Sequence, residues 1–145
     1  MQLEEAIKRL EEHILSMIDA VKRHTMTDLI VGHIPMATAY NFRYTLERKP
    51  LNVTSSTLTK VAHRLDHLES CKTYSKELKQ ILNSFVNDYI FVDSINELTK
   101  NGLNYKTLKN MEDKSLKTSY RLSTMVKYAR DIDVKRKEGA IVCKR

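Results

Sequence analysis

The sequence is poor in the residues that turn or break a chain. It holds three glycines, two prolines and no tryptophan among 145 residues. A β-sandwich or barrel needs Gly, Pro, Asn or Asp at a turn about every ten residues, which this chain does not supply. Hydrophobic residues make up 41% and charged residues 30%, a balance typical of a folded globular domain rather than a disordered segment. We therefore expect an all-α fold.

Cysteines and long apolar runs are also scarce. Cys71 and Cys143 are too few for a disulfide framework, which favours a reducing compartment. No apolar run approaches the roughly 18 residues that a transmembrane helix needs. The first five residues include two glutamates and do not resemble a signal peptide. These absences predict a cytoplasmic protein with no membrane partner.

The net positive charge lies in one half of the chain. Residues 1–70 carry nine Lys/Arg and nine Asp/Glu, a net charge of 0, whereas residues 71–145 carry sixteen against nine, a net charge of +7. A basic half favours a polyanionic partner, most often nucleic acid, and the plain alternative is a solvated basic surface.

The first helix is expected over residues 2–23. Its apolar positions are Leu3, Ile7, Leu10, Ile14, Met17 and Val21. Steps of four and three residues form the heptad pattern of a coiled coil or a tight bundle. This Leu3–Val21 seam predicts either a homodimer through the helix or an amphipathic helix packed in the chain's own core.

The rest of the chain also has helical periodicity. Further helices are expected at about 25–32, 36–48, 56–70, 74–90, 92–100, 104–111 and 120–133. Thr25 and Asn104 have the side chains of helix N-caps, and Asn101-Gly102 suits a tight turn. Residues 135–145 hold five cations against one acid and indicate a basic C-terminal tail.

The two halves resemble each other. At an offset of 69, Leu29, Thr38 and Asn41 align with Leu98, Thr107 and Asn110. At an offset of 67, residues 56–66 align with 123–133 and five of these eleven positions are identical. We predict three parts: an N-terminal helix with a first repeat over 1–70, a second repeat over 71–134, and a tail over 135–145.

Each repeat contains a short helix, a three-residue turn and a second helix. This unit resembles the helix-turn-helix of Cro/repressor-type DNA-binding proteins, and residues 97–109 also resemble the start of a MerR-type helix-turn-helix. Gly102, Leu103 and Asn104 carry the likeness, because those families place a Gly and an aliphatic residue in the turn and a cap before the second helix. The resemblance implies an all-α fold of two helix-turn-helix-like repeats that binds double-stranded DNA.

The second repeat has the chemistry of a DNA-reading helix. A helix in the major groove presents its N-terminal residues to base edges. The outward positions would be Tyr105, Lys106, Lys109 and Asn110. Asn pairs well with adenine, and Lys contacts guanine or phosphate. Lys114, Lys117 and Arg121 follow, in places suited to the flanking phosphates.

The first repeat differs at the same places. Asn41 and Arg43 are its candidate DNA contacts, but the neighbouring outward residues are apolar or aromatic. We interpret this copy as a degenerate one that reads thymine methyl groups or packs against a protein partner. Met36, Tyr40 and Tyr44 would meet that partner.

No pattern indicates catalysis, a metal or a cofactor. His63, His67 and Cys71 are four residues apart and have zinc-ligand side chains, but no second pair of ligands is nearby, so we interpret them as a polar surface stripe. The sequence has no phosphate-binding glycine loop, nucleophile elbow or paired-cysteine pattern. We expect a protein that is not an enzyme.

Two functions fit these observations. The first is a sequence-specific, dimeric transcriptional regulator, a repressor of phage or mobile-element type. The alternative is a small protein-interaction module or inhibitor, such as an anti-defence protein, that blocks a nucleic-acid-binding partner. The Lys- and Asn-rich second repeat favours the first, and the apolar second helix of the first repeat favours the other.

Overall fold

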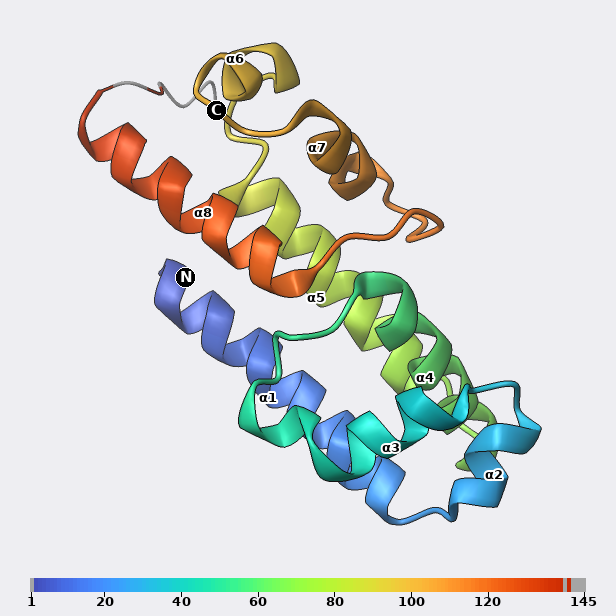
Figure 1. Ribbon diagram of the computed structural model, residues 1–145. Coiled ribbons are helices and arrows are strands. Elements are labelled where there is room, and N and C mark those ends of the chain that lie inside the picture. The colour runs from blue at the N-terminus through green and yellow to red at the C-terminus, as the bar shows by residue number, and fades with distance from the viewer. Residues whose placement is uncertain (1, 140, 142–145) are drawn as a thin grey trace.

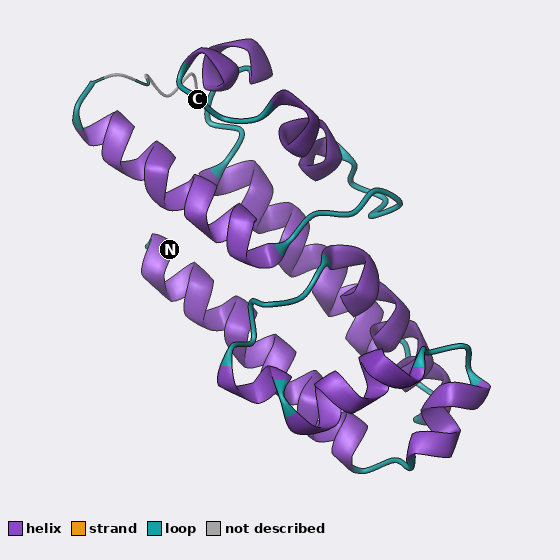
Figure 2. Ribbon diagram, in the orientation of Figure 1, coloured by secondary structure: helices purple, strands orange, loops and turns teal. Residues whose placement is uncertain are grey.

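The computed structural model describes residues 2–139 and 141, and the regular elements of this part of the chain are helices joined by loops (Figures 1 and 2). The elements are α1 (Leu3–Lys22), α2 (Met26–Val31), α3 (Met36–Tyr44), the 3-10 helix η1 (Leu46–Arg48), α4 (Ser55–Leu68), α5 (Thr73–Tyr89), α6 (Ile95–Lys100), α7 (Tyr105–Glu112) and α8 (Leu122–Lys137). The expected all-α class is confirmed.

The same succession of helices occurs twice. A long helix, two short helices and another long helix form α1–α4, and the order recurs in α5–α8. The start of α2 and the start of α6 are each capped by a hydroxyl, Thr25 and Ser94, which accepts a hydrogen bond from the backbone N–H three residues on. Capping by Thr25 and Asn104 is confirmed.

The turn after the first short helix also repeats in detail. The N–H of Ile34 donates to the carbonyl of Leu29 at 3.3 Å, and that of Leu103 donates to Leu98 at 3.3 Å. His33 and Gly102 occupy the same place with φ of 65° and 93°. Positive φ costs a glycine little and a histidine more, so the second copy holds the turn with less strain.

The two halves join through the strand-like residues that precede α4 and α8. Thr54 and Arg121 form an isolated antiparallel bridge. On either side of it, the N–H of Ser55 donates to the carbonyl of Tyr120 at 2.8 Å, and that of Leu122 donates to Val53 at 3.0 Å. Equivalent positions of the two repeats thus face each other, as in an approximate two-fold relation.

The apolar seam of α1 lies inside the chain. Ile7, Leu10, Ile14, Met17 and Val21 are all at most 3% exposed, and α1 contacts α3, α4, α5 and α8. This is the core-helix alternative of the sequence analysis. In this structure these side chains are covered by other helices of the same chain.

Several element boundaries differ from those expected. The helix predicted over 36–48 ends at Tyr44 and continues as η1, and α6 begins only at Ile95, after its Ser94 cap. The final helix runs to Lys137, so three cations assigned to the basic tail form its last turn. Lys144 and Arg145 lie outside the described residues.

The short helices lie at opposite ends of the molecule. In Figure 1, α2 and α3 are at the lower end and α6 and α7 at the upper end, with the long helices between them. Equivalent faces of the two repeats are therefore far apart and differ in the residues that they expose.

Candidate nucleic-acid interface

Helix α7 is anchored on one side and exposed on the other. Leu108 and Met111 are at most 2% exposed and fix the helix on the core. Tyr105, Lys106 and Lys109 are exposed at its start and middle. This places three of the four predicted outward residues on one accessible face.

Asn110, the fourth predicted residue, is engaged with the chain itself. Its Nδ2 donates to the carbonyl of Ser119 at 3.2 Å, and its own carbonyl accepts from Thr118 Oγ1 at 2.7 Å. The side chain is half-buried. Asn110 therefore holds the loop after α7 in place, and its amide could contact a base only by releasing Ser119.

Asp113 organises that loop. It accepts hydrogen bonds from the hydroxyl of Ser115 at 2.6 Å and from the backbone N–H groups of Ser115, Lys117 and Thr118. These bonds, the Ser115 hydroxyl first, lower the pKa of Asp113 to about 2. The Asp113 carboxylate therefore bonds to its own loop and holds it in place. Lys114 and Lys117 are exposed side chains of this loop.

Arg121 lies where the loop meets the other repeat. It is exposed, and its Nη1 donates to Asn52 Oδ1 at 3.2 Å. One contact leaves most of its five donors for another acceptor such as a phosphate. Lys114, Lys117 and Arg121 are therefore all available at the edge of α7.

The sequence reasoning missed Lys100 at the end of α6. Its side chain is 72% exposed and pairs with Glu97 at 3.3 Å, as Lys109 pairs with Glu112 at 3.3 Å. Such exposed pairs within one helix are weak and exchange readily, so neither fixes its lysine. Its place in the sequence could have indicated it, because Lys100 is the last residue of the first short helix in the helix-turn-helix-like unit. We call the exposed cations of this region the basic face: Lys100, Lys106, Lys109, Lys114, Lys117 and Arg121.

The predicted DNA contacts of the first repeat, Asn41 and Arg43, form hydrogen bonds within the chain. Arg43 is half-buried and its Nη1 donates to the carbonyl of His24 at 2.8 Å, which ties α3 to the end of α1. Asn41 is also half-buried, and its Oδ1 accepts from Thr45 Oγ1. The structure thus does not bring these two residues to an exposed basic surface.

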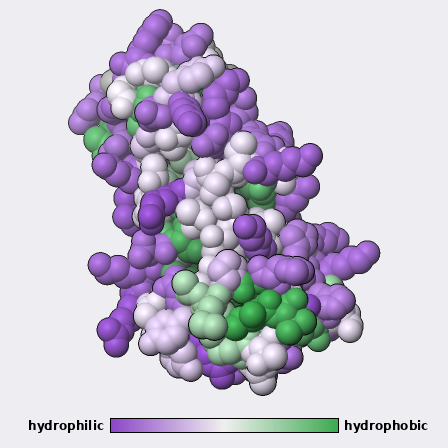
Figure 3. Space-filling model, turned by 45° about the vertical axis from the view of Figure 1, so that its right-hand side comes forward, coloured by the Kyte–Doolittle hydropathy of each residue, from purple (hydrophilic) through white to green (hydrophobic). Residues whose placement is uncertain are grey.

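The first repeat instead exposes an apolar face. Five large side chains of α2 and α3 are exposed: Ile30 (37%), Val31 (68%), Met36 (67%), Tyr40 (56%) and Tyr44 (58%). The rings of Tyr40 and Tyr44 lie 4.7 Å apart. Figure 3 shows hydrophobic side chains gathered at the lower end of the molecule, where α2 and α3 lie.

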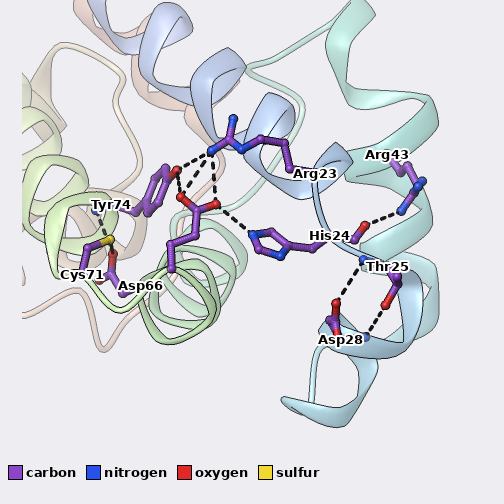
Figure 4. Close-up of polar contacts among 9 residues, drawn as sticks. Arg23, His24, Thr25, Asp28, Arg43, Asp66, Cys71 and Tyr74 are labelled. Atoms are coloured by element: carbon purple, nitrogen blue, oxygen red, sulfur yellow. Dashed lines mark hydrogen bonds and ion pairs between the residues drawn. The ribbon is translucent and has the colours of Figure 1, made fainter.

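A polar cluster at the junction of the repeats is the other concentration of charge (Figure 4). Glu69 accepts from His24 at 2.8 Å, from Tyr74 at 2.7 Å and from Arg23 at 3.2 Å. Partial burial acts to raise the pKa of Glu69, but the hydrogen bonds from His24, Tyr74 and Arg23 outweigh it and leave that pKa below its usual value. These groups satisfy one another, so the cluster joins α1, α4 and α5 rather than offering a free acid or base.

The carboxylate of Asp66 has a similar joining role. It is 8% exposed and accepts from the N–H groups of Tyr74 at 2.9 Å and Ser75 at 3.3 Å, so α4 caps the start of α5. Cys71 Sγ lies 3.7 Å from the same carboxylate, while His63 and His67 are exposed. Within residues 2–139 and 141, no three His, Cys, Asp or Glu side chains gather to hold a metal ion.

Comparison with models of known families, with curated proteins and with solved structures found no match for the chain. Among the described helices none is both long and apolar enough to cross a membrane.

Proposed function

We propose that this chain is a double-stranded DNA-binding regulator of transcription that contacts DNA through α7 and the loop that follows it. The basic face of the second repeat is the observation that carries the proposal. Six exposed cations lie on α7, on the preceding helix α6 and between α7 and the start of α8, and the opposite side of α7 is buried. DNA binding depends above all on the neutralisation of phosphates by such side chains.

The arrangement assigns different roles to parts of the face. In the major groove, the start of α7 would present Tyr105, Lys106 and Lys109 to base edges. Lys114, Lys117 and Arg121 would contact the flanking phosphates and fix the helix in register. Asn110 supports the loop through Ser119. A repressor of phage or mobile-element type, acting in the cytoplasm, is the specific form of regulator that we favour.

A gel-shift assay on random duplex DNA across a salt series tests the proposal. Affinity should fall by about 0.9 log unit per log unit of salt for each phosphate neutralised. Lys114→Ala and Lys117→Ala should each weaken all duplexes alike and make the slope shallower by about one contact. Lys60→Ala, at an exposed lysine of α4 in the first repeat, is the matched control and should change neither. A salt-independent complex, or no complex, would contradict the proposal.

The exposed apolar face of α2 and α3 favours a second candidate function, a protein-interaction module that inhibits a nucleic-acid-binding partner. Contiguous apolar surface on a globular protein often marks an interaction site. In that case Tyr40→Ala would abolish capture of the partner, and substitutions in the basic face of α7 would leave the capture intact.

A further inference from the structure

We infer that the apolar face of α2 and α3 is the surface through which two copies of this chain associate. This face consists of Ile30, Val31, Met36, Tyr40 and Tyr44. The inference goes beyond the proposed function and does not rest on DNA binding. It also differs from the seam of α1, which is consumed in the chain's own core.

The size of the face fits a modest interface between copies. From the exposed fractions, the five side chains present about 600 Å² to solvent, the upper end of the largest patch that monomeric proteins expose. Two such faces in complete contact would bury at most about 1,200 Å², which is the lower end for a specific interface. The paired rings of Tyr40 and Tyr44 supply the aromatic contact typical of interface centres.

The charge distribution argues for a second copy as the occupant. A symmetric contact brings each residue near its own counterpart, so a charged face would meet like charge. None of the five side chains is charged, and the nearest guanidiniums are held within the chain: Arg43 by the carbonyl of His24, and Arg64 by the carbonyl of Asp28 at 2.6 Å. Contact at this face therefore brings none of its five side chains against a like charge, and the guanidinium of Arg43, 6.0 Å from the ring of Tyr44, is a positive charge beside it.

The equivalent face of the second repeat carries lysines and is therefore unsuited to self-association. At an offset of 69, the positions of Val31, Met36 and Tyr40 are those of Lys100, Tyr105 and Lys109. The excess of +7 lies in the second half, and α6 and α7 are at the other end of the molecule (Figure 1). Association through α2 and α3 thus keeps the two basic faces apart and turned outward.

The inference is tested by substitutions that give α2 and α3 the lysines found at the equivalent positions of the second repeat. Val31→Lys and Tyr40→Lys place a charge on two side chains that are more than half exposed, so both variants should keep the wild-type circular dichroism. Thr99→Lys, at an exposed position of α6, adds the same charge at the other end and is the matched control. The masses are measured by sedimentation velocity from micromolar to hundreds of micromolar chain.

The wild type and Thr99→Lys should form dimers, and each first-repeat variant should be a monomer over the same range. Added salt should change the dimer little, because the five side chains of the face are uncharged, whereas it weakens DNA binding, so the two proposals fail separately. A monomeric wild type at all concentrations would overturn the inference, as expected if a different protein covers the face. Dimers that persist in both variants would overturn it as well.

Discussion

At the scale of single residues, several buried or half-buried polar side chains join segments of the fold. Asp66, Asn110 and Arg43 each bond to backbone groups of another segment. Such bonds are costly to leave unmade once water is excluded. Among the predicted DNA contacts, those that remain exposed are therefore at the start and middle of α7, in its following loop and at Arg121.

Substitution of Asp66 should weaken the junction between the repeats. Asp66→Ala leaves the N–H groups of Tyr74 and Ser75 without their acceptor, and we expect the free energy of unfolding to fall by about 2 kcal/mol. Asp66→Asn retains one acceptor oxygen and should lose less. Urea unfolding measures both, and an Asp66→Ala variant as stable as the wild type would contradict this role.

His13 should make the fold sensitive to acid. Burial lowers its pKa, which the carbonyl of Tyr74 and the carboxylate of Glu77 only partly oppose and Arg9 reinforces. Nε2 has no hydrogen-bond partner among the described residues. The unfolded chain, with a His pKa of about 6.5, takes up the proton first. Stability should therefore be full above that pH and decline as the pH falls below it.

Urea unfolding on either side of about pH 6.5 measures the effect of His13. His13→Leu should remove much of the decline, because leucine takes up no proton and its apolar side chain suits this buried place in α1. His63→Leu, at an exposed histidine, is the control. An equal pH dependence in the His13 variant and the wild type would refute the assignment.

At the scale of elements, α1 shows that an amphipathic pattern does not say whether a helix packs against its own chain or against another chain. The spacing of Ile7, Leu10 and Ile14 predicts a buried stripe equally for a dimer and for a core. The structure places this stripe against α3, α4, α5 and α8 of the same chain. The same helical succession in the second half supplies α5 and α8, so the two repeats complete each other's core.

A charge in the α1 seam should therefore unfold the chain. Ile14 is fully buried, and Ile14→Asp should cost more than about 4 kcal/mol, comparable with the whole stability of a small domain. Lys8→Asp, on the exposed side of the same helix, should fold normally. Circular dichroism with light scattering distinguishes unfolding from a folded monomer, and the latter result would restore the seam as an interface.

At the scale of the whole molecule, local features were predictable from the sequence and long-range contacts were not. The caps Thr25 and Asn104 and the outward lysines of α7 follow from residue type and helical period. The bridge between Thr54 and Arg121 and the bond from Arg43 to His24 join segments far apart in the chain. Neither leaves a signal in spacing, because backbone groups pair whatever side chain they carry and every arginine offers the same donors to any carbonyl.

The division between a basic and an apolar end is the central claim for the whole molecule. Backbone amide NMR of the labelled protein, titrated with duplex DNA, tests it most directly. Residues 104–121 should shift strongly with added DNA, and residues 26–44 should stay in place. Shifts confined to residues 26–44, or no shifts at low salt, would contradict the assignment of the second repeat as the DNA-binding unit.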